Sequence, residues 1–257
     1  MMFATIAAKE LKSLFASPLA WIVLTVLQFV LGYVFLKRLD DFLQIQPQLI
    51  QLASPPGVTE MVAGPTFALA AIVLLFAVPL LAMRAIAEER RNQTMVFLMS
   101  APVSVTDIVL GKFCGLLAFL ALIIALVTLM PLSLAATTQL DYGLIGCVVL
   151  GLLLLAANFA AVGLYVSSLT AYPVAAALGA FAALLAMMLM GDSLGDGLDA
   201  RAGAIAGALA QVFAPLHNFE PLGKGLLDSA AIVCSLLLTV FFLVLTVRRL
   251  DLQRVRG

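Results

Sequence analysis

Charged residues are scarce in this sequence. Asp, Glu, Lys and Arg make up 11% of its 257 residues, whereas an average soluble domain carries about 25%. Hydrophobic residues account for 64%, and the mean hydropathy is +1.16. A water-soluble core cannot absorb so much apolar surface in a chain of this length, so the composition argues against a soluble globular enzyme. It indicates an all-α polytopic membrane protein, and the absence of a clustered basic surface argues against nucleic-acid binding.

Residues that bind metals are scarce as well. His217 is the only histidine, and the three cysteines fall in or beside apolar stretches without the spacing of a metal site. We therefore predict no metal site and interpret the cysteines as small buried apolar residues. The pairs Gly111–Lys112 and Gly223–Lys224 lack the earlier glycine and the following Ser or Thr of a phosphate-binding loop. The chain is therefore not expected to hydrolyse ATP or to be an enzyme.

Six apolar stretches are long enough to cross a bilayer, whose hydrocarbon core of ~30 Å requires about 20 helical residues. The first is followed by Lys37 and Arg38, where a cleaved signal peptide would have small residues, so we interpret it as a retained helix. The six predicted spans cover Leu19–Leu36, Thr66–Met83, Ile108–Met130, Leu144–Ser167, Pro173–Met190 and Ser229–Val247.

The distribution of basic residues predicts the orientation. With the N-terminus inside, ten Lys and Arg residues lie on the inner side and four on the outer side, which satisfies the positive-inside rule. This predicts that both termini lie on the inner, cytoplasmic side of the membrane. No Asp, Glu, Lys or Arg falls in the middle of a span, which disfavours an ion-coupled carrier because such carriers use charged groups within the membrane.

Two segments outside the spans are also expected to contact membrane lipids. Residues 2–16 place apolar side chains on one helical face and Lys9 and Lys12 on the other, as in a helix that lies in the membrane surface. The alternative is a continuation of the first span, but Ser17 precedes Pro18 and therefore disfavours helical geometry. Between spans five and six, residues 202–214 are too short to span and predict a short helix that dips into the membrane.

The segment between spans two and three is the most informative. A compact charged block is followed by a short apolar stripe at 95–99 and by a turn at Ala101–Pro102. We predict a cytoplasmic helix over 85–100, and Ser104 or Thr106 is suited to cap the next helix. Such a helix either docks in a groove of a soluble partner or is a solvated connector, and composition alone leaves both open.

Three residues within the spans suggest roles in a transport path. Gln28 and Asn158 are polar residues at membrane depth. Interhelical hydrogen bonding is the simpler explanation for both, and contact with a transported substrate is the alternative. Pro79 should kink the second span near Phe76, and this kink could be a hinge or could be static.

Residues 87–113, AEERRNQTMVFLMSAPVSVTDIVLGKF, resemble the cytoplasmic segment of type-2 ABC exporter permeases. That family has an acidic pair, a Thr–Met or Thr–Leu step, a run of Leu, a small-residue–Pro turn and a Gly–Lys at the next span. Residues 9–22, 164–176 and 217–228 are also similar, and the last two resemble the gliding-motility and nitrous-oxide-reductase-maturation branch. The matching positions in the first segment are Glu88, Glu89, Thr94, Leu98, Pro102, Gly111 and Lys112.

The resemblance implies a homodimeric permease of the bacterial cytoplasmic membrane that binds two copies of a cytosolic ABC ATPase, with ATP and Mg on the ATPase. The alternative is a membrane scaffold that uses the same docking to drive or recruit an envelope protein without moving a solute. The external loops look short, so an accessory envelope protein would be a separate chain. The resemblance implies that the residues that couple the permease to the ATPase are Glu88, Glu89, Arg90, Arg91, Thr94 and Leu98.

Overall fold

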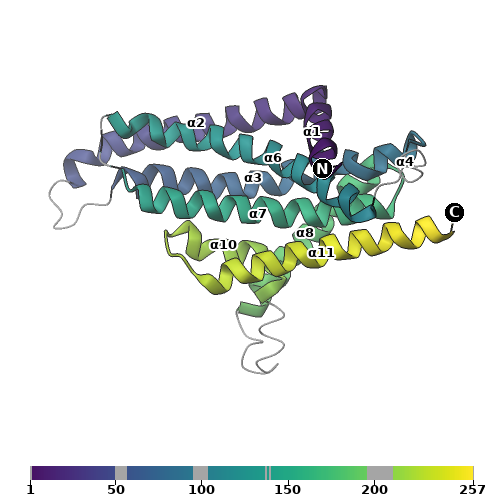
Figure 1. Ribbon diagram of the computed structural model, residues 1–257. Helices are drawn as coiled ribbons and strands as arrows, with labels where there is room; N and C mark the ends of the chain where they lie inside the picture. The colour runs from purple at the N-terminus through teal and green to yellow at the C-terminus, as the bar shows by residue number, and fades with distance from the viewer. Residues whose placement is uncertain are drawn as a thin grey trace.

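The computed structural model describes residues 2–49, 57–94, 104–136, 138, 140–195 and 211–256. All regular structure in these residues is helical, which confirms the predicted all-α class. Figure 1 shows long helices running side by side, with a short helix set across one end of the bundle. The long helices are α2 (Pro18–Leu49), α3 (Gly64–Met83), α6 (Val105–Leu132), α7 (Tyr142–Leu169), α8 (Pro173–Gly195) and α11 (Ser229–Arg256).

Both described chain ends lie at the same end of the bundle, which we call the terminal end, and the other end is the distal end (Figure 1). The short helix α1 (Met2–Phe15) lies at the terminal end and is separated from α2 by Ala16 and Ser17. The predicted break before Pro18 is therefore confirmed. Helix α10 (Pro215–Gly223) lies in the distal half, beside α7 and α11.

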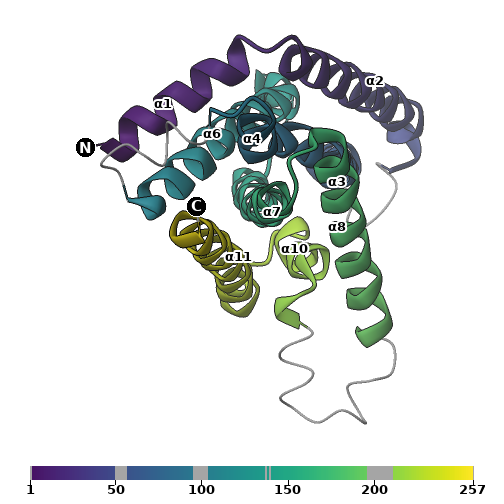
Figure 2. The same cartoon turned by 90° about the vertical axis from the view of Figure 1, so that its right-hand side faces the viewer.

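Five helical stretches are long and apolar enough to cross a membrane. They contain the first four predicted spans and the last one, and they cover Pro18–Pro47, Thr59–Arg91, Val105–Ala136, Tyr142–Leu169 and Ser229–Arg254. The remaining prediction, 173–190, is helical in α8, whose apolar portion Pro173–Leu189 is shorter. Helix α8 leaves the bundle at an angle, so that its far end stands away from the other helices (Figures 1 and 2).

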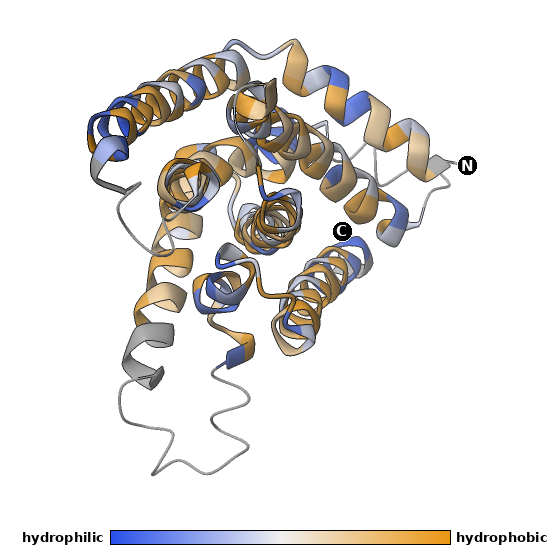
Figure 3. Ribbon diagram, turned by 90° about the vertical axis from the view of Figure 1, so that its left-hand side faces the viewer, coloured by the Kyte–Doolittle hydropathy of each residue, from blue (hydrophilic) through white to orange (hydrophobic). Residues whose placement is uncertain are grey.

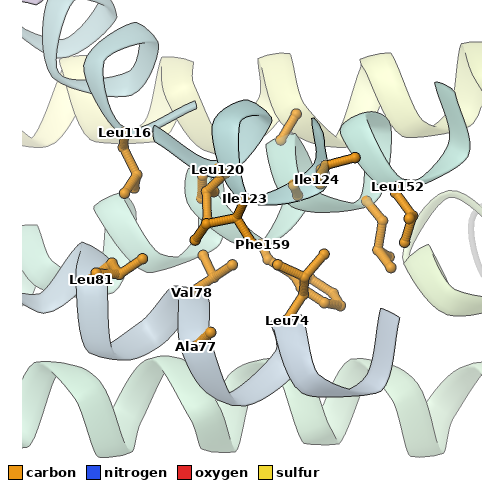
Figure 4. Packing of buried hydrophobic residues seen from close by; sticks show 14 of the residues in the cluster. Leu74, Ala77, Val78, Leu81, Leu116, Leu120, Ile123, Ile124, Leu152 and Phe159 are labelled. Atoms are coloured by element: carbon orange, nitrogen blue, oxygen red, sulfur yellow. The ribbon is translucent and has the colours of Figure 1, made fainter. Parts of the chain in front are cut away.

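Helix α7 lies at the centre of the bundle, with α3, α6, α10 and α11 around it (Figure 2). Small residues let these helices approach closely, as is usual for helices packed in a membrane. A Cβ built at Gly163 would lie 2.6 Å from the Cβ of Ala82, so only glycine fits at this crossing of α7 and α3. Around it, α3, α6 and α7 interdigitate through Leu74, Val78, Leu81, Leu116, Leu120, Ile123, Ile124, Leu152 and Phe159 (Figure 4).

The outer surface of the bundle is also rich in apolar side chains. Figure 3 shows hydrophobic residues on all sides of the long helices. On α2, Phe29 is 75% exposed, and Tyr33 and Leu36 are also exposed. A soluble domain rarely carries so large a continuous apolar surface, so this surface is matched to lipid.

Helix α3 does not stop at the predicted end of span two. It continues into η2 (Arg84–Glu88), a π-helical turn, and then α4 (Glu89–Arg91). The predicted helix over 85–100 is therefore corrected: the helix ends at Arg91 because Gln93 adopts a left-handed φ of 57° within a turn over 92–94. The rest of that predicted helix, 95–100, lies outside the described residues.

Three other predictions have mixed outcomes. Ser104 caps α6, since its hydroxyl oxygen accepts a hydrogen bond from the Asp107 N–H at 3.1 Å. Pro79 is buried within the continuous helix α3, and the predicted hinge at this position stays a prediction. Most of the predicted membrane-dipping helix, 202–210, lies outside the described residues.

Candidate functional site

Charged side chains collect at the terminal end of the bundle, around the segment Arg84–Thr94, which we call the charged segment. It continues directly from α3, so any displacement of the segment is transmitted along a helix of the bundle. Figure 2 shows α4 at this end, close to α6 and with α1 and α3 nearby. Three sets of contacts hold the segment in place.

The first set is a buried ion cluster around Lys112 of α6. The Lys112 side chain is only 1% exposed, and its Nζ lies 2.7 Å from Oε1 of Glu10 and 2.8 Å from Oε1 of Glu89. A buried ammonium needs such partners, because desolvating an unpaired charge is costly. The cluster therefore joins three separate elements, namely α1, α6 and α4. We call these three residues the Lys112 cluster.

The close approach of α1 to α6 depends on two glycines that precede and follow this lysine. A Cβ at Gly111 would lie 2.7 Å from Cγ2 of Ile6, and a Cβ at Gly115 would lie 2.7 Å from the Cβ of Glu10. The absence of side chains at these positions lets the backbone of α1 lie directly on α6. Glu10 can reach Lys112 only because of this short separation.

The second set of contacts supports the π-helical turn η2. The Ser167 hydroxyl oxygen at the end of α7 accepts hydrogen bonds from the N–H groups of Ile86 and Ala87 at 3.3 and 3.0 Å. The same hydroxyl donates to the Met83 carbonyl oxygen at 3.1 Å. A π-helical turn departs from the regular α-helical hydrogen-bond ladder, and such turns are frequent at functional sites. Here one fully buried serine satisfies the displaced groups.

The third set consists of arginine contacts at the edges of the segment. Arg84 pairs with Glu88, with Nε 2.5 Å from Oε2, and also donates to the hydroxyl of Ser17 at the α1–α2 corner. Arg90 donates to the side-chain oxygen of Gln253 near the end of α11. The segment is thus tied to the first and the last helices of the chain.

A polar cavity of about 230 Å³ lies between α1, α6 and the charged segment. Its lining includes Lys9, Ser13 and Asn92, in addition to the charged residues described above. The second carboxylate oxygen of Glu89, Oε2, is buried and has no hydrogen-bond partner in the described part of the chain. The Lys112 cluster therefore borders a space in which side chains could rearrange.

The predicted coupling residues fall into two groups. Glu88, Glu89 and Arg90 are engaged within the protein, whereas Arg91 and Thr94 are exposed. Thr94 closes the turn, since its N–H and its hydroxyl both donate to the Glu89 carbonyl oxygen at 3.0 and 3.2 Å. The exposed tip of the site, among the described residues, is therefore residues 91–94. The sixth predicted residue, Leu98, lies outside the described residues.

The polar residues predicted within the spans are not brought together. Gln28 of α2 donates to the Leu126 carbonyl oxygen of α6 at 3.3 Å. Asn158 of α7 accepts from the hydroxyl of Thr239 in α11 at 2.8 Å, and its Nδ2 is buried without a partner among the described residues. Each residue thus joins a different pair of helices, as expected for interhelical hydrogen bonds.

Sequence reasoning missed the role of Lys112, which entered only as part of a Gly–Lys motif. The available signal was a lone lysine inside the predicted span 108–130, close to the inner end of that span. Among the described residues, no group of three or more His, Cys, Asp or Glu side chains could hold a metal ion.

Comparison with known proteins bears on the whole chain. No curated protein matches the sequence. Residues 4–253 match the family model described as ABC-2 family transporter protein. The match begins within α1 and ends near the end of α11, so it includes the charged segment and every helix that contacts it.

Proposed function

The chain belongs to the ABC-2 transporter family, and we propose that it is the permease subunit of an ATP-driven exporter in the bacterial cytoplasmic membrane. Members of this family work with an ATPase subunit. We propose two copies of this chain and two copies of a cytosolic ATPase, with ATP and Mg bound by the ATPase. The substrate is exported across the membrane or extracted from it.

The observation that supports this proposal is the construction of the charged segment. Its tip, residues 91–94, is exposed, while its base is held by the Lys112 cluster and by Ser167. A soluble partner that binds the tip and moves with nucleotide state would therefore displace α3 directly. It would displace α1 and α6 through Glu89 and Lys112. A solvated connector would have no need for a buried ammonium bound to two other elements.

The proposed topology places the terminal end in the cytoplasm, because most of the Lys and Arg residues belong to this end or its flanking segments. The bundle then crosses the membrane six times, with α8 as the fifth span. Helix α1 lies across the bundle end, and we propose that it lies in the inner surface of the membrane. We also propose that Gln28 and Asn158 border the substrate path and that Pro79 is a hinge of α3. A separate envelope protein is an additional proposed partner.

The decisive experiment is to isolate the tagged full-length chain from its native membranes in a mild detergent and to measure the mass and composition of the complex. We expect two copies of this chain with two ATPase subunits that carry a phosphate-binding loop. The variant Arg91→Glu should reduce the amount of ATPase recovered, because it reverses a charge at the exposed tip. The matched control Lys37→Glu reverses an exposed charge near the distal end of α2 and should leave recovery unchanged.

Two results would contradict parts of the proposal. Isolation of the chain without any ATPase, with nucleotide present throughout, would overturn the ATP-driven permease. Equal recovery of the ATPase with both variants would remove residues 91–94 from the docking surface. If the complex hydrolyses ATP and the rate responds to an envelope protein but to no solute or lipid, the scaffold function replaces export.

A further inference from the structure

An apolar groove of about 440 Å³ lies in the distal half of the bundle, far from the charged segment. The first two turns of α3 form one wall, with Ala68 and Ile72 exposed, and α10 forms the other wall. Val148 of α7 contributes to the lining between them. The groove extends along α3 from Gly64 to Ile72, a length of about 12 Å at 1.5 Å per helical residue.

The walls of this groove are fixed by packing. A Cβ at Gly151 of α7 would lie 2.9 Å from the Cβ of Leu222 and 3.0 Å from Cδ2 of Phe219, so α10 lies directly on α7. One turn beyond Ile72, α3 contacts α8 through Phe76 and Phe181, whose ring centroids are 5.0 Å apart. Because α8 leaves the bundle at an angle (Figure 2), α8 covers α3 at this contact and stands away from it further along. The groove is thus a preformed space.

The lining carries charge in only one place. Glu220 and Lys224 line the groove on α10 and just after it, and both side chains are exposed. The Lys224 N–H donates to the Glu220 carbonyl oxygen at 3.1 Å, so the two residues are one helical turn apart. No ion pair joins their side chains, and neither pairs with another charged residue in the described part of the chain.

We propose that this groove binds a zwitterionic phospholipid that carries an ammonium group, from the leaflet at the distal end. One acyl chain fills the apolar groove, the phosphate contacts Lys224, and the ammonium group contacts Glu220. The volume and the predominantly apolar lining with few polar groups are those of a ligand site. Opposite charges one helical turn apart complement a headgroup that carries both signs. This inference goes beyond the proposed function, and it requires neither an ATPase nor a defined transport direction.

Binding of an acyl chain in the groove is tested by substituting Ala68, which is exposed and lines the groove. The variant Ala68→Trp would fill the groove without displacing a core side chain, and Ala182→Trp places the same side chain on an exposed position of α8 outside the lining. Each protein is delipidated in mild detergent and titrated with dioleoyl phosphatidylethanolamine, and bound lipid is counted by native mass spectrometry. We expect about tenfold weaker binding for Ala68→Trp, equivalent to the loss of ~1.4 kcal/mol, and unchanged binding for the control. Equal lipid binding by the two variants would overturn the proposal.

Recognition of the headgroup by Glu220 and Lys224 is tested by competition between phosphatidylethanolamine and phosphatidylglycerol of the same acyl composition. Both lipids carry the phosphate, and only phosphatidylethanolamine carries the ammonium group. The wild-type protein should prefer phosphatidylethanolamine by about fivefold to tenfold, a typical effect of one charge-assisted contact. Glu220→Gln should abolish this preference while retaining binding, and Lys224→Met should weaken binding of both lipids. A preference of the wild type for phosphatidylglycerol would overturn the assignment of Glu220. If Ala68→Trp instead converts a dimer to a monomer with lipid binding unchanged, the groove is an interface between two copies and not a lipid site.

Discussion

The two ends of the bundle use charge in opposite ways. At the terminal end, several charged side chains are partly or fully buried and paired with one another, and Lys112 contacts both Glu10 and Glu89. At the distal end, Glu220 and Lys224 are exposed beside an apolar groove and do not pair. Charges that are already paired make the protein rigid at that end. Charges left exposed beside a groove are available to a ligand that the chain itself does not supply.

The two ends should also differ in how much their charged residues contribute to stability. Paired charges at the terminal end stabilise the fold, so their removal should be detectable as a loss of stability without any partner present. Exposed charges at the distal end should be nearly irrelevant to stability. Measurements of thermal unfolding in detergent can therefore test the comparison directly, and the expected effects decrease in the order given below.

The largest effect is expected for Lys112→Met. The substitution removes the ammonium group and leaves Glu10 and Glu89 facing each other with little access to water, and breaking a buried pair from one side typically costs ~3–5 kcal/mol. We expect a marked fall in the thermal unfolding temperature. The control Lys224→Met removes an exposed lysine and should change the stability by no more than ~0.5 kcal/mol. Similar unfolding temperatures for the two variants would show that the Lys112 cluster does not hold the terminal end together.

The second largest loss of stability is expected at the crossing of α7 and α3. In Gly163→Ala the added Cβ would lie 2.6 Å from the Cβ of Ala82, so the two helices would have to separate. Overpacking of this kind costs ~1–3 kcal/mol. Gly146→Ala on the same helix meets nothing within 4 Å and should be neutral or slightly stabilising. If both variants unfold at the wild-type temperature, the close contact of α7 with α3 is wrong.

A smaller effect is expected at the π-helical turn. Ser167→Ala would leave the N–H groups of Ile86 and Ala87 without their side-chain acceptor, at a cost of ~1–2 kcal/mol. Ser168→Ala is the matched control, because that equally buried hydroxyl donates only to the Tyr165 carbonyl oxygen of its own helix. We expect a lower unfolding temperature for the first variant, and faster hydrogen exchange at 84–88. Equal exchange in the two variants would contradict the role of Ser167.

The smallest effects are expected for exposed charges at either end. Arg91→Glu and Glu220→Gln should each change the stability by no more than ~0.5 kcal/mol, since both side chains are exposed. Unfolding temperatures close to wild type would allow their effects on ATPase and lipid binding to be attributed to the lost contacts. A large destabilisation by either substitution would place that residue among the structural charges instead.

Much of the fold could be predicted because hydropathy and helix breaks are local signals. The apolar runs gave the long helices, the Ser17–Pro18 step gave the end of α1, and Ser104 gave the start of α6. The helix predicted over 85–100 is helical to Arg91 and is interrupted at 92–94, because composition did not reveal the left-handed turn at Gln93. Helix α10 was missed, although Pro215 at its first position was a usable signal.

The candidate site was predictable only in outline. The sequence singled out the block Glu88–Arg91, but it could not show that Glu89 faces inward while Arg91 faces outward. That distinction depends on Lys112 and on Glu10, which lies 102 residues earlier than Lys112 in the chain. Pairing across such a separation depends on the tertiary arrangement of α1 and α6. Likewise, the support of η2 by Ser167 depends on where α7 ends and not on any motif around that serine.

The separation of Glu10 from Lys112 has a consequence for how the protein is made. At about 5–20 residues per second, a ribosome needs ~5–20 seconds to synthesise the 102 residues between them. During that interval Glu10 of α1 lacks Lys112, its cationic partner on α6. The arrival of α6 then allows the ion pair between α1 and α6 to form. A nascent chain that stops before residue 112 therefore holds Glu10 and Glu89 without the buried cation that both contact in the complete fold.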